Sequence, residues 1–208
     1  MRENGRFGPI EWARAGRPMP SEYTSGDRGI AIDIDGAAAL FGLVDGLGHG
    51  PSAAEAALRA VDTITRAGSE RVEVLIQLCH RVLVGTRGVA MTLVRIDFAA
   101  NTLTWTGVGN VTAHLVSKAP TGVDVRSSAR LTAGIVGYRI PEIKPAQVVP
   151  IRPGDLIVMS TDGITEDFLD HIDFSASAVA IADGLLGKDA KETDDAMVLA
   201  ARHRGVTM

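Results

Sequence analysis

The sequence has little of several features that mark particular classes of protein. It contains one cysteine in 208 residues, which excludes an internal disulfide framework and fits a reducing compartment. Aromatic residues make up 4% of the chain, too few for a platform that stacks nucleic-acid bases. The net charge is −4 and no run of Lys and Arg occurs, so we expect no nucleic-acid partner.

Long apolar runs are also missing. No segment has the length that a membrane-spanning helix needs, and residues 1–7 are polar, unlike a signal peptide. We therefore expect a cytoplasmic protein with no membrane partner. The composition, 46% hydrophobic and 22% charged, predicts a single globular domain over residues 1–208, with residues 1–7 as a loose N-terminal tail.

Several common catalytic motifs are absent. The glycines of residues 46–50 do not complete a dinucleotide fingerprint, because Pro51 stands where the last glycine is needed. No Gly-x-x-x-x-Gly-Lys-Ser/Thr loop is present, which excludes a P-loop nucleotidase. A Gly-x-Ser-x-Gly nucleophile elbow is missing too, so the function must rest on other residues.

The hydrophobic pattern predicts strands joined in hairpins and a small number of helices. Strands are expected at 10–15 (as an edge strand), 30–34, 39–44, 89–98, 103–108, 111–116, 156–159 and 196–200, and helices at about 52–68, 70–84 and 174–186. Asp35-Gly36 predicts a hairpin turn, and Ser52 with Glu55 predicts a capping box. We expect an α+β layered fold, with antiparallel sheets faced by helices.

Acidic residues stand at the ends of predicted strands. These positions hold Asp27, Asp45, Asp162 and the pair Asp194-Asp195. A single Asp-Gly at a strand end is more often a turn, but several carboxylates that meet at one edge repel one another unless cations lie between them. Oxygen ligands without Cys or suitably spaced His favour Mg²⁺ or Mn²⁺ over zinc. Two such ions about 3.5–4 Å apart would activate water at neutral pH, a design for phosphate-ester hydrolysis.

Five short motifs occur in an order that resembles a known family. They are Gly26-Asp27, Asp-Gly-Leu-Gly-His-Gly at 45–50, Gly-Val-Gly-Asn at 107–110, Ser-Thr-Asp-Gly-Ile at 160–164, and Asp194-Asp195. In this order they resemble the metal-dependent (type 2C-like) serine/threonine phosphatases, specifically the bacterial SpoIIE-like branch. Within that branch the chain looks most like the small RsbX-type phosphatases of the stressosome pathway. The resemblance extends from about residue 26 to residue 200.

This resemblance implies an αββα sandwich with two Mn²⁺ or Mg²⁺ ions at one end of the sheets. The ligands that it implies are Asp27, Asp45, Gly46 (through its carbonyl), Asp162 and Asp194. Asp45 would bridge both ions, and with Asp162 and Asp194 it would form the catalytic centre.

The roles of three neighbouring residues stay open. His49 is either a general acid for the leaving serine oxygen, or a residue that contacts the substrate or supports the ligands. We favour the second interpretation, because the family also fills this position with Ser. Arg28 is either a phosphate contact or an exposed loop residue. Asp195 would support the ligands, although Ala196-Met197 follow where the family usually has a hydrophobic residue and Thr.

The resemblance also predicts the reaction and the partners. The protein would be a monomeric phosphoprotein phosphatase that uses a metal-activated hydroxide, without a phospho-enzyme. Its substrates would be phosphorylated STAS-domain proteins of a stressosome, and dephosphorylation would reset a stress signal. Two alternatives remain. One is a phosphatase of an anti-sigma-factor antagonist outside a stressosome, and the other is a catalytically silent module that binds partners.

Overall fold

The computed structural model describes residues 1–205, which form two β-sheets, three α-helices and one short 3-10 helix. The first sheet consists of β1 (Arg2–Phe7), β2 (Ile10–Arg17), β7 (Thr112–Lys118), β8 (Val123–Ser128), β11 (Leu156–Ser160) and β12 (Ala196–His203). The second consists of β3 (Asp27–Ile34), β4 (Ala38–Gly46), β5 (Val89–Asp97), β6 (Thr102–Val108), β9 (Leu131–Thr132) and β10 (Gln147–Pro150). The helices are α1 (Pro51–Arg66), α2 (Val72–Val82), η1 (Phe168–His171) and α3 (Ala178–Asp189).

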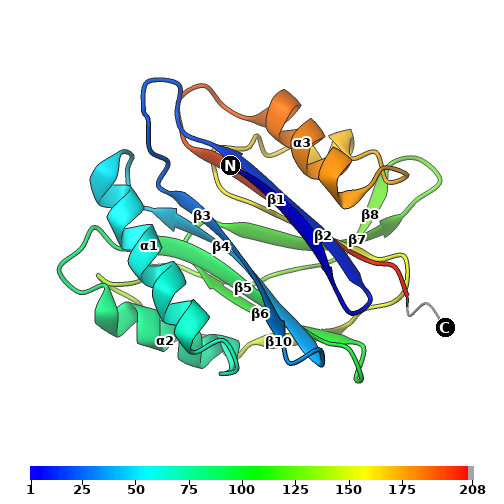
Figure 1. Cartoon of the computed structure of the whole chain (residues 1–208), viewed down its shortest axis with the longest axis horizontal. Coiled ribbons are helices and arrows are strands. Elements are labelled where there is room, and N and C mark those ends of the chain that lie inside the picture. Colours follow the sequence, from blue (N-terminus) through cyan, green and yellow to red (C-terminus); the bar gives the residue numbers. More distant parts are fainter. Residues whose placement is uncertain (206–208) are drawn as a thin grey trace.

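These elements form four layers. The strand order is β1-β2-β12-β11-β7-β8 in the first sheet and β10-β6-β5-β4-β3 in the second, where β9 pairs with β6. Figure 1 shows α1 and α2 on one side of the two sheets and α3 on the other. The predicted αββα sandwich and its α+β class are confirmed.

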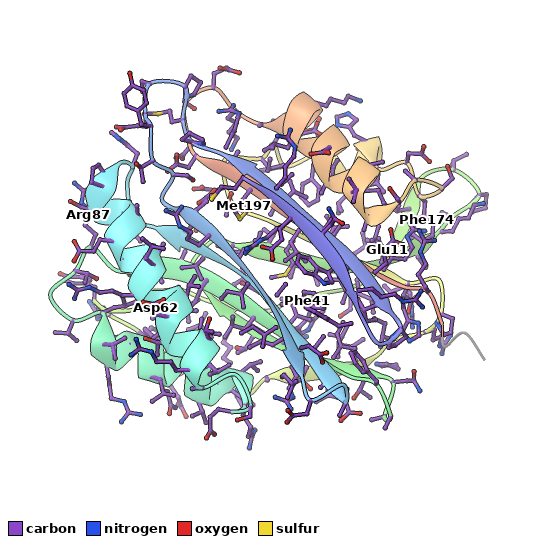
Figure 2. All side chains as sticks on the ribbon, viewed as in Figure 1. Glu11, Phe41, Asp62, Arg87, Phe174 and Met197 are labelled. Carbon is purple, nitrogen blue, oxygen red and sulfur yellow. The ribbon has the colours of Figure 1, made fainter. Side chains whose placement is uncertain are left out.

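A central core lies between the two sheets. Its members include Phe41 (labelled in Figure 2) and Trp105 from the second sheet, and Met159 and Leu199 from the first. β4 is buried along almost its whole length, as its continuous apolar sequence predicts, because the central core covers one face and α1 and α2 cover the other. The alanines on the inner face of α1 let this helix lie close to the sheet.

The N-terminal segment differs from the prediction. Residues 1–7 are not a loose tail, because β1 pairs with β2 from Arg2↔Ala15 to Phe7↔Ile10. An edge strand is held mainly by backbone hydrogen bonds, and its exposed side chains leave no hydrophobic pattern in the sequence. The predicted strand at 10–15 exists as β2, but its edge position is wrong. Because β1 occupies the edge, β2 lies between β1 and β12.

The helix starts also differ in detail. The predicted capping box is wrong: α1 begins at Pro51, and its N-cap residue is Gly50, which has no side chain that could accept a hydrogen bond from the first turn. Proline suits the first turn of a helix because its fixed φ is helical and its missing N–H would have no partner there. The hairpin turn at Asp35-Gly36 is confirmed by positive φ angles of 53° and 66°. No helix within residues 1–205 is both long enough and apolar enough to cross a membrane.

Candidate metal centre

The acidic residues at the strand ends meet at one end of the sandwich, and both sheets contribute to them. In the second sheet Asp27 and Asp45 are register partners of the antiparallel pair β3 and β4. In the first sheet Asp162 follows β11, and the pair Asp194-Asp195 precedes β12, which is the antiparallel neighbour of β11. Because an antiparallel neighbour begins where the previous strand ends, the acids of each sheet lie at one end of that sheet. A hydrogen bond from Thr161 to Asp27 shows that these two ends lie together.

Thr161 connects the two halves of this centre. Its hydroxyl donates to Asp27 Oδ2 at 2.7 Å and accepts from the backbone N–H of Met197 at 2.9 Å. Thr161 and Asp27 are each 1% exposed. The bond therefore orients a buried carboxylate of the second sheet from the loop that follows β11 in the first.

Asp195 holds the chain that leads to Asp27. Its Oδ2 accepts from the backbone N–H of Gly26 at 2.6 Å, and its Oδ1 accepts from that of Met19 at 2.8 Å. Asp194 lies closer to the surface, and its Oδ1 accepts from the backbone N–H of Asp195 at 2.9 Å. Asp195 therefore orders the segment that precedes Asp27, whereas its support of metal ligands stays a prediction.

Two residues next to Asp162 have roles that sequence reasoning did not assign. Asn110 donates from Nδ2 to Asp162 Oδ2 at 2.7 Å, and Lys191 donates from Nζ to the Asp162 carbonyl at 2.6 Å. Asn110 belongs to the motif at 107–110, so its position in the ordered set of motifs could have identified it as a residue of the site. Lys191 lies in a charged loop where no pattern distinguishes it from other surface lysines.

The Asp-Gly pairs at 45–46 and 162–163 need glycine, because at each glycine the backbone closely approaches another segment. A Cβ on Gly46 would lie 2.1 Å from the carbonyl oxygen of Ala53, at the start of α1. A Cβ on Gly163 would lie 1.8 Å from the carbonyl oxygen of Asp195. These glycines therefore allow the segments that carry Asp45, Asp162 and Asp195 to come together.

The carboxyl groups of the centre are unfavourable in their ionised form unless positive charge lies near them. Burial, and then the charges of Asp162, Asp194 and Asp195, raise the pKa of Asp45 to about 8. Burial and the charge of Asp45 raise the pKa of Asp27 well above its ordinary value, despite the bond from Thr161. Burial and the charge of Asp162 raise the pKa of Asp194. A set of crowded carboxylates with only oxygen donors fits hard divalent cations such as Mg²⁺ or Mn²⁺.

Arg28 and His49 lie near the centre but bond elsewhere. Arg28 donates from Nη1 to the carbonyl oxygens of Ser25 at 2.6 Å and Asp27 at 2.7 Å, which fixes the turn into β3. His49 Nδ1 lies 2.8 Å from Glu22 Oε1 in an exposed pair. Arg87, labelled in Figure 2, lies beside this loop, with Nη1 3.5 Å from the His49 carbonyl. Phosphate binding by Arg28 and substrate contact by His49 both stay predictions.

Comparison with known proteins places this architecture in a family. The family model of Stage II sporulation protein E (SpoIIE) matches residues 35–205. The chain is 26% identical over 156 residues to the phosphoserine phosphatase RsbX of Bacillus subtilis (strain 168), an alignment that covers 74% of this chain and 75% of that protein.

Solved structures show the same fold. A chain from the study "The bacterial stressosome: a modular system that has been adapted to control secondary messenger signaling" superposes with a TM-score of 0.82 and 28% identity, over 93% of this chain and 99% of that chain. RsbX in complex with magnesium superposes with a TM-score of 0.82 and 21% identity, over 97% of this chain and 98% of that chain.

Fold and comparisons together define the class as the PP2C-type α+β sandwich phosphatases. The chain belongs to the SpoIIE family, since the family model matches most of its length. It is a serine/threonine phosphoprotein phosphatase related to RsbX, of a type that depends on metal ions. The predicted family and enzyme class are confirmed, whereas the individual ligand assignments stay predictions.

Proposed function

We propose that the chain dephosphorylates phosphorylated STAS-domain proteins of a stressosome, with two Mn²⁺ or Mg²⁺ ions as cofactors. The ligands in this proposal are Asp27, Asp45, the Gly46 carbonyl, Asp162 and Asp194. The observation that carries it is the meeting of strand-end carboxylates from both sheets, where burial and then the neighbouring carboxylates raise the pKa of Asp45 to about 8. The similarity to RsbX and to a chain from a stressosome study supports the choice of substrate.

The protein groups have separate tasks in this proposal. When bound, the two cations would supply an acidic water and offset the charge of the phosphoryl group. Thr161 engages Oδ2 of Asp27, and Asn110 engages Oδ2 of Asp162, so each bond fixes the orientation of one carboxylate. Asp195 fixes the loop that precedes Asp27. Preorganised ligands of this kind need little rearrangement when a cation binds.

The surroundings of Asp162 suit a substrate that is itself a folded protein. Asp162 and Asn110 are exposed. A groove of about 340 Å³ adjoins them, and its lining includes Thr112, His114 and Phe168. A phosphorylated side chain on the surface of a partner can reach the carboxylates along this open side.

The proposed enzyme is a monomer with one domain over residues 1–208. Sedimentation velocity tests this by the presence or absence of a 21.9 kDa species.

The first experiment tests the chemistry. Hydrolysis of p-nitrophenyl phosphate is measured after chelation and after addition of Mn²⁺ or Mg²⁺, for the parent protein and for Asp45→Asn. We expect activity only with metal, and a loss of at least about 100-fold in the variant. Asp62→Asn on the exposed side of α1 (Figure 2) is the matched control and should keep full activity. Turnover without metal, or an unaffected Asp45→Asn, would contradict the mechanism.

The second experiment tests the substrate. Immobilised Asp162→Asn protein is exposed to phosphorylated lysate and, as a control, to the same lysate after dephosphorylation. We expect a phosphorylated STAS-domain stressosome protein to be retained from the first lysate alone. Retention of only an anti-sigma-factor antagonist from outside a stressosome would favour the alternative phosphatase. Retention of no STAS-domain protein would refute the proposed substrate, while the activity assay would still stand.

A further inference from the structure

A second group of potential metal ligands lies outside the acidic centre. It consists of Asp167, His171 and Asp189, and one donor atom from each lies within 4.8 Å of the donor atoms of the other two. Asp167 immediately precedes η1, His171 is the last residue of η1, and Asp189 is the last residue of α3. Two segments that are distant in sequence therefore bring two carboxylates and one imidazole together.

Asp189 is the unusual member of this group. Its side chain is 3% exposed, and its Oδ1 lies 2.5 Å from Nδ1 of His171. Its Oδ2 is buried and has no hydrogen-bond partner among residues 1–205. A buried carboxylate oxygen without a partner is unfavourable. The negative end of the α3 dipole adds to this cost, and both effects favour a cation at this point.

We propose that Asp167, His171 and Asp189 bind a divalent transition metal of the zinc type, at a site separate from the catalytic centre. Two carboxylates offset the charge of one divalent ion. The imidazole makes the set suited to zinc-like ions, whereas Mg²⁺ prefers oxygen ligands alone. Asp167 is exposed, so water can complete the coordination on the outer side.

Metal binding requires one local change. Zinc bonds to nitrogen and oxygen are about 2.0–2.2 Å long, so an ion does not fit between two atoms 2.5 Å apart. The ion would therefore use the unpartnered Oδ2 of Asp189, while the ring of His171 turns away from Oδ1. The side chain of His171 is 27% exposed, which leaves room for this rotation toward solvent.

Backbone hydrogen bonds connect the proposed site to the catalytic loop. The N–H of Thr165 donates to the carbonyl of Asp189 at 2.9 Å, and the N–H of Lys191 donates to that of Gly163 at 2.8 Å. Lys191 Nζ also donates to the Asp162 carbonyl. An ion that ties η1 to the end of α3 would therefore hold the loop that carries Asp162. The proposed role is structural.

The test uses protein in which the catalytic centre is disabled by Asp45→Asn and Asp162→Asn together. Metal-stripped protein is dialysed against Zn²⁺, bound metal is quantified by elemental analysis, and Co²⁺ absorption provides a spectroscopic readout of the ligands. We expect one bound Zn²⁺ per chain. Adding His171→Gln should weaken the binding at least about tenfold. Asp170→Asn is the matched control, because Asp170 is an exposed neighbour outside the group, and it should leave binding unchanged.

The possible results separate this site from the phosphatase proposal, because no turnover is measured. Absence of bound Zn²⁺ in the catalytically disabled protein would overturn the inference. Binding that persists in both His171→Gln and Asp189→Asn would overturn it too. Thermal unfolding gives an independent check, since Zn²⁺ should stabilise the disabled protein but not its His171→Gln form. If Asp189→Asn does not fold, His171→Gln alone decides the question.

Discussion

The hydroxyl of Thr161 donates a hydrogen bond to Asp27 Oδ2, and this buried contact joins the loop after β11 to the start of β3, 134 positions apart in the sequence. Replacing Thr161 with Val keeps the shape of the side chain but leaves a buried carboxylate without its donor. We expect Thr161→Val to lower the free energy of unfolding by about 1–3 kcal/mol in urea titrations, and to reduce phosphatase activity. Thr161→Ser retains the hydroxyl and should preserve most of both; equal losses in the two variants would contradict this role.

The raised pKa of Asp45 predicts how the stability of the metal-free protein depends on pH. This carboxyl has an ordinary value of 3.8 and a value of about 8 in the folded chain, so between these pH values the folded state binds more protons than the unfolded state. The free energy of unfolding therefore decreases as the pH rises, by up to about 1.4 kcal/mol per pH unit for one carboxyl. Asp27 and Asp194 act in the same direction.

Thermal unfolding of chelator-treated protein between about pH 5 and pH 8 measures this dependence. We expect the Tm to fall with rising pH, and Asp45→Asn to flatten the curve. Added Mg²⁺ should raise the Tm more at the upper end of the range, because it binds the ionised carboxylates. A Tm that rises steadily with pH in the absence of metal would refute the electrostatic argument.

Asn110 is expected to influence metal binding rather than folding. Its amide holds one oxygen of Asp162, and both residues are exposed. We expect Asn110→Ala to raise the Mn²⁺ concentration that gives half-maximal activity by about tenfold, because Asp162, a ligand in the proposed function, becomes free to rotate. Its Tm in chelator should change little. An unchanged metal requirement would show that this hydrogen bond does not order the ligand.

Gly163 should tolerate no side chain. A Cβ there would meet the Asp195 carbonyl oxygen at 1.8 Å, so Gly163→Ala must push the Asp162 loop away from β12. We expect a loss of about 1–3 kcal/mol in stability together with loss of activity. Gly187→Ala is the control: this glycine lies within α3 with no atom near its Cβ position, so alanine there should be neutral or stabilising by up to about 1 kcal/mol. Similar effects at both positions would contradict the steric explanation.

Much of the fold could be predicted because strong local patterns coincide with tertiary burial. The apolar run of β4 and the acids at its end and after β11 can be recognised in the sequence. The order of the motifs that contain these acids indicates the family. β1 could not be predicted, because an exposed edge strand is held by backbone bonds that carry no side-chain pattern. The start of α1 was misplaced because Ser52 and Glu55 form a plausible cap, while Pro51 sets the actual first turn.

The centre itself was only partly predictable. Strand ends with Asp are local features, but the bonds that orient them cross large sequence distances, as between Asp195 and Gly26. The contacts of Lys191 with Asp162 and of Glu22 with His49 depend on how loops fold over the end of the sandwich. Such loop contacts follow from the assembled fold, so no short motif reports them.

The position of β12 has a consequence for how the molecule is made. Although β12 is the last strand along the described chain, it lies between β2 and β11 inside its sheet. During synthesis, β2 and β11 therefore leave the ribosome before the strand that joins them. Until β12 follows, the backbone N–H and C=O groups along one edge of each strand lack their partners in the sheet. Asp194 and Asp195, which precede β12, complete the acidic centre at the same moment. A nascent chain that stops before Asp194 therefore lacks both the strand that joins β2 to β11 and the last two carboxylates of the acidic centre.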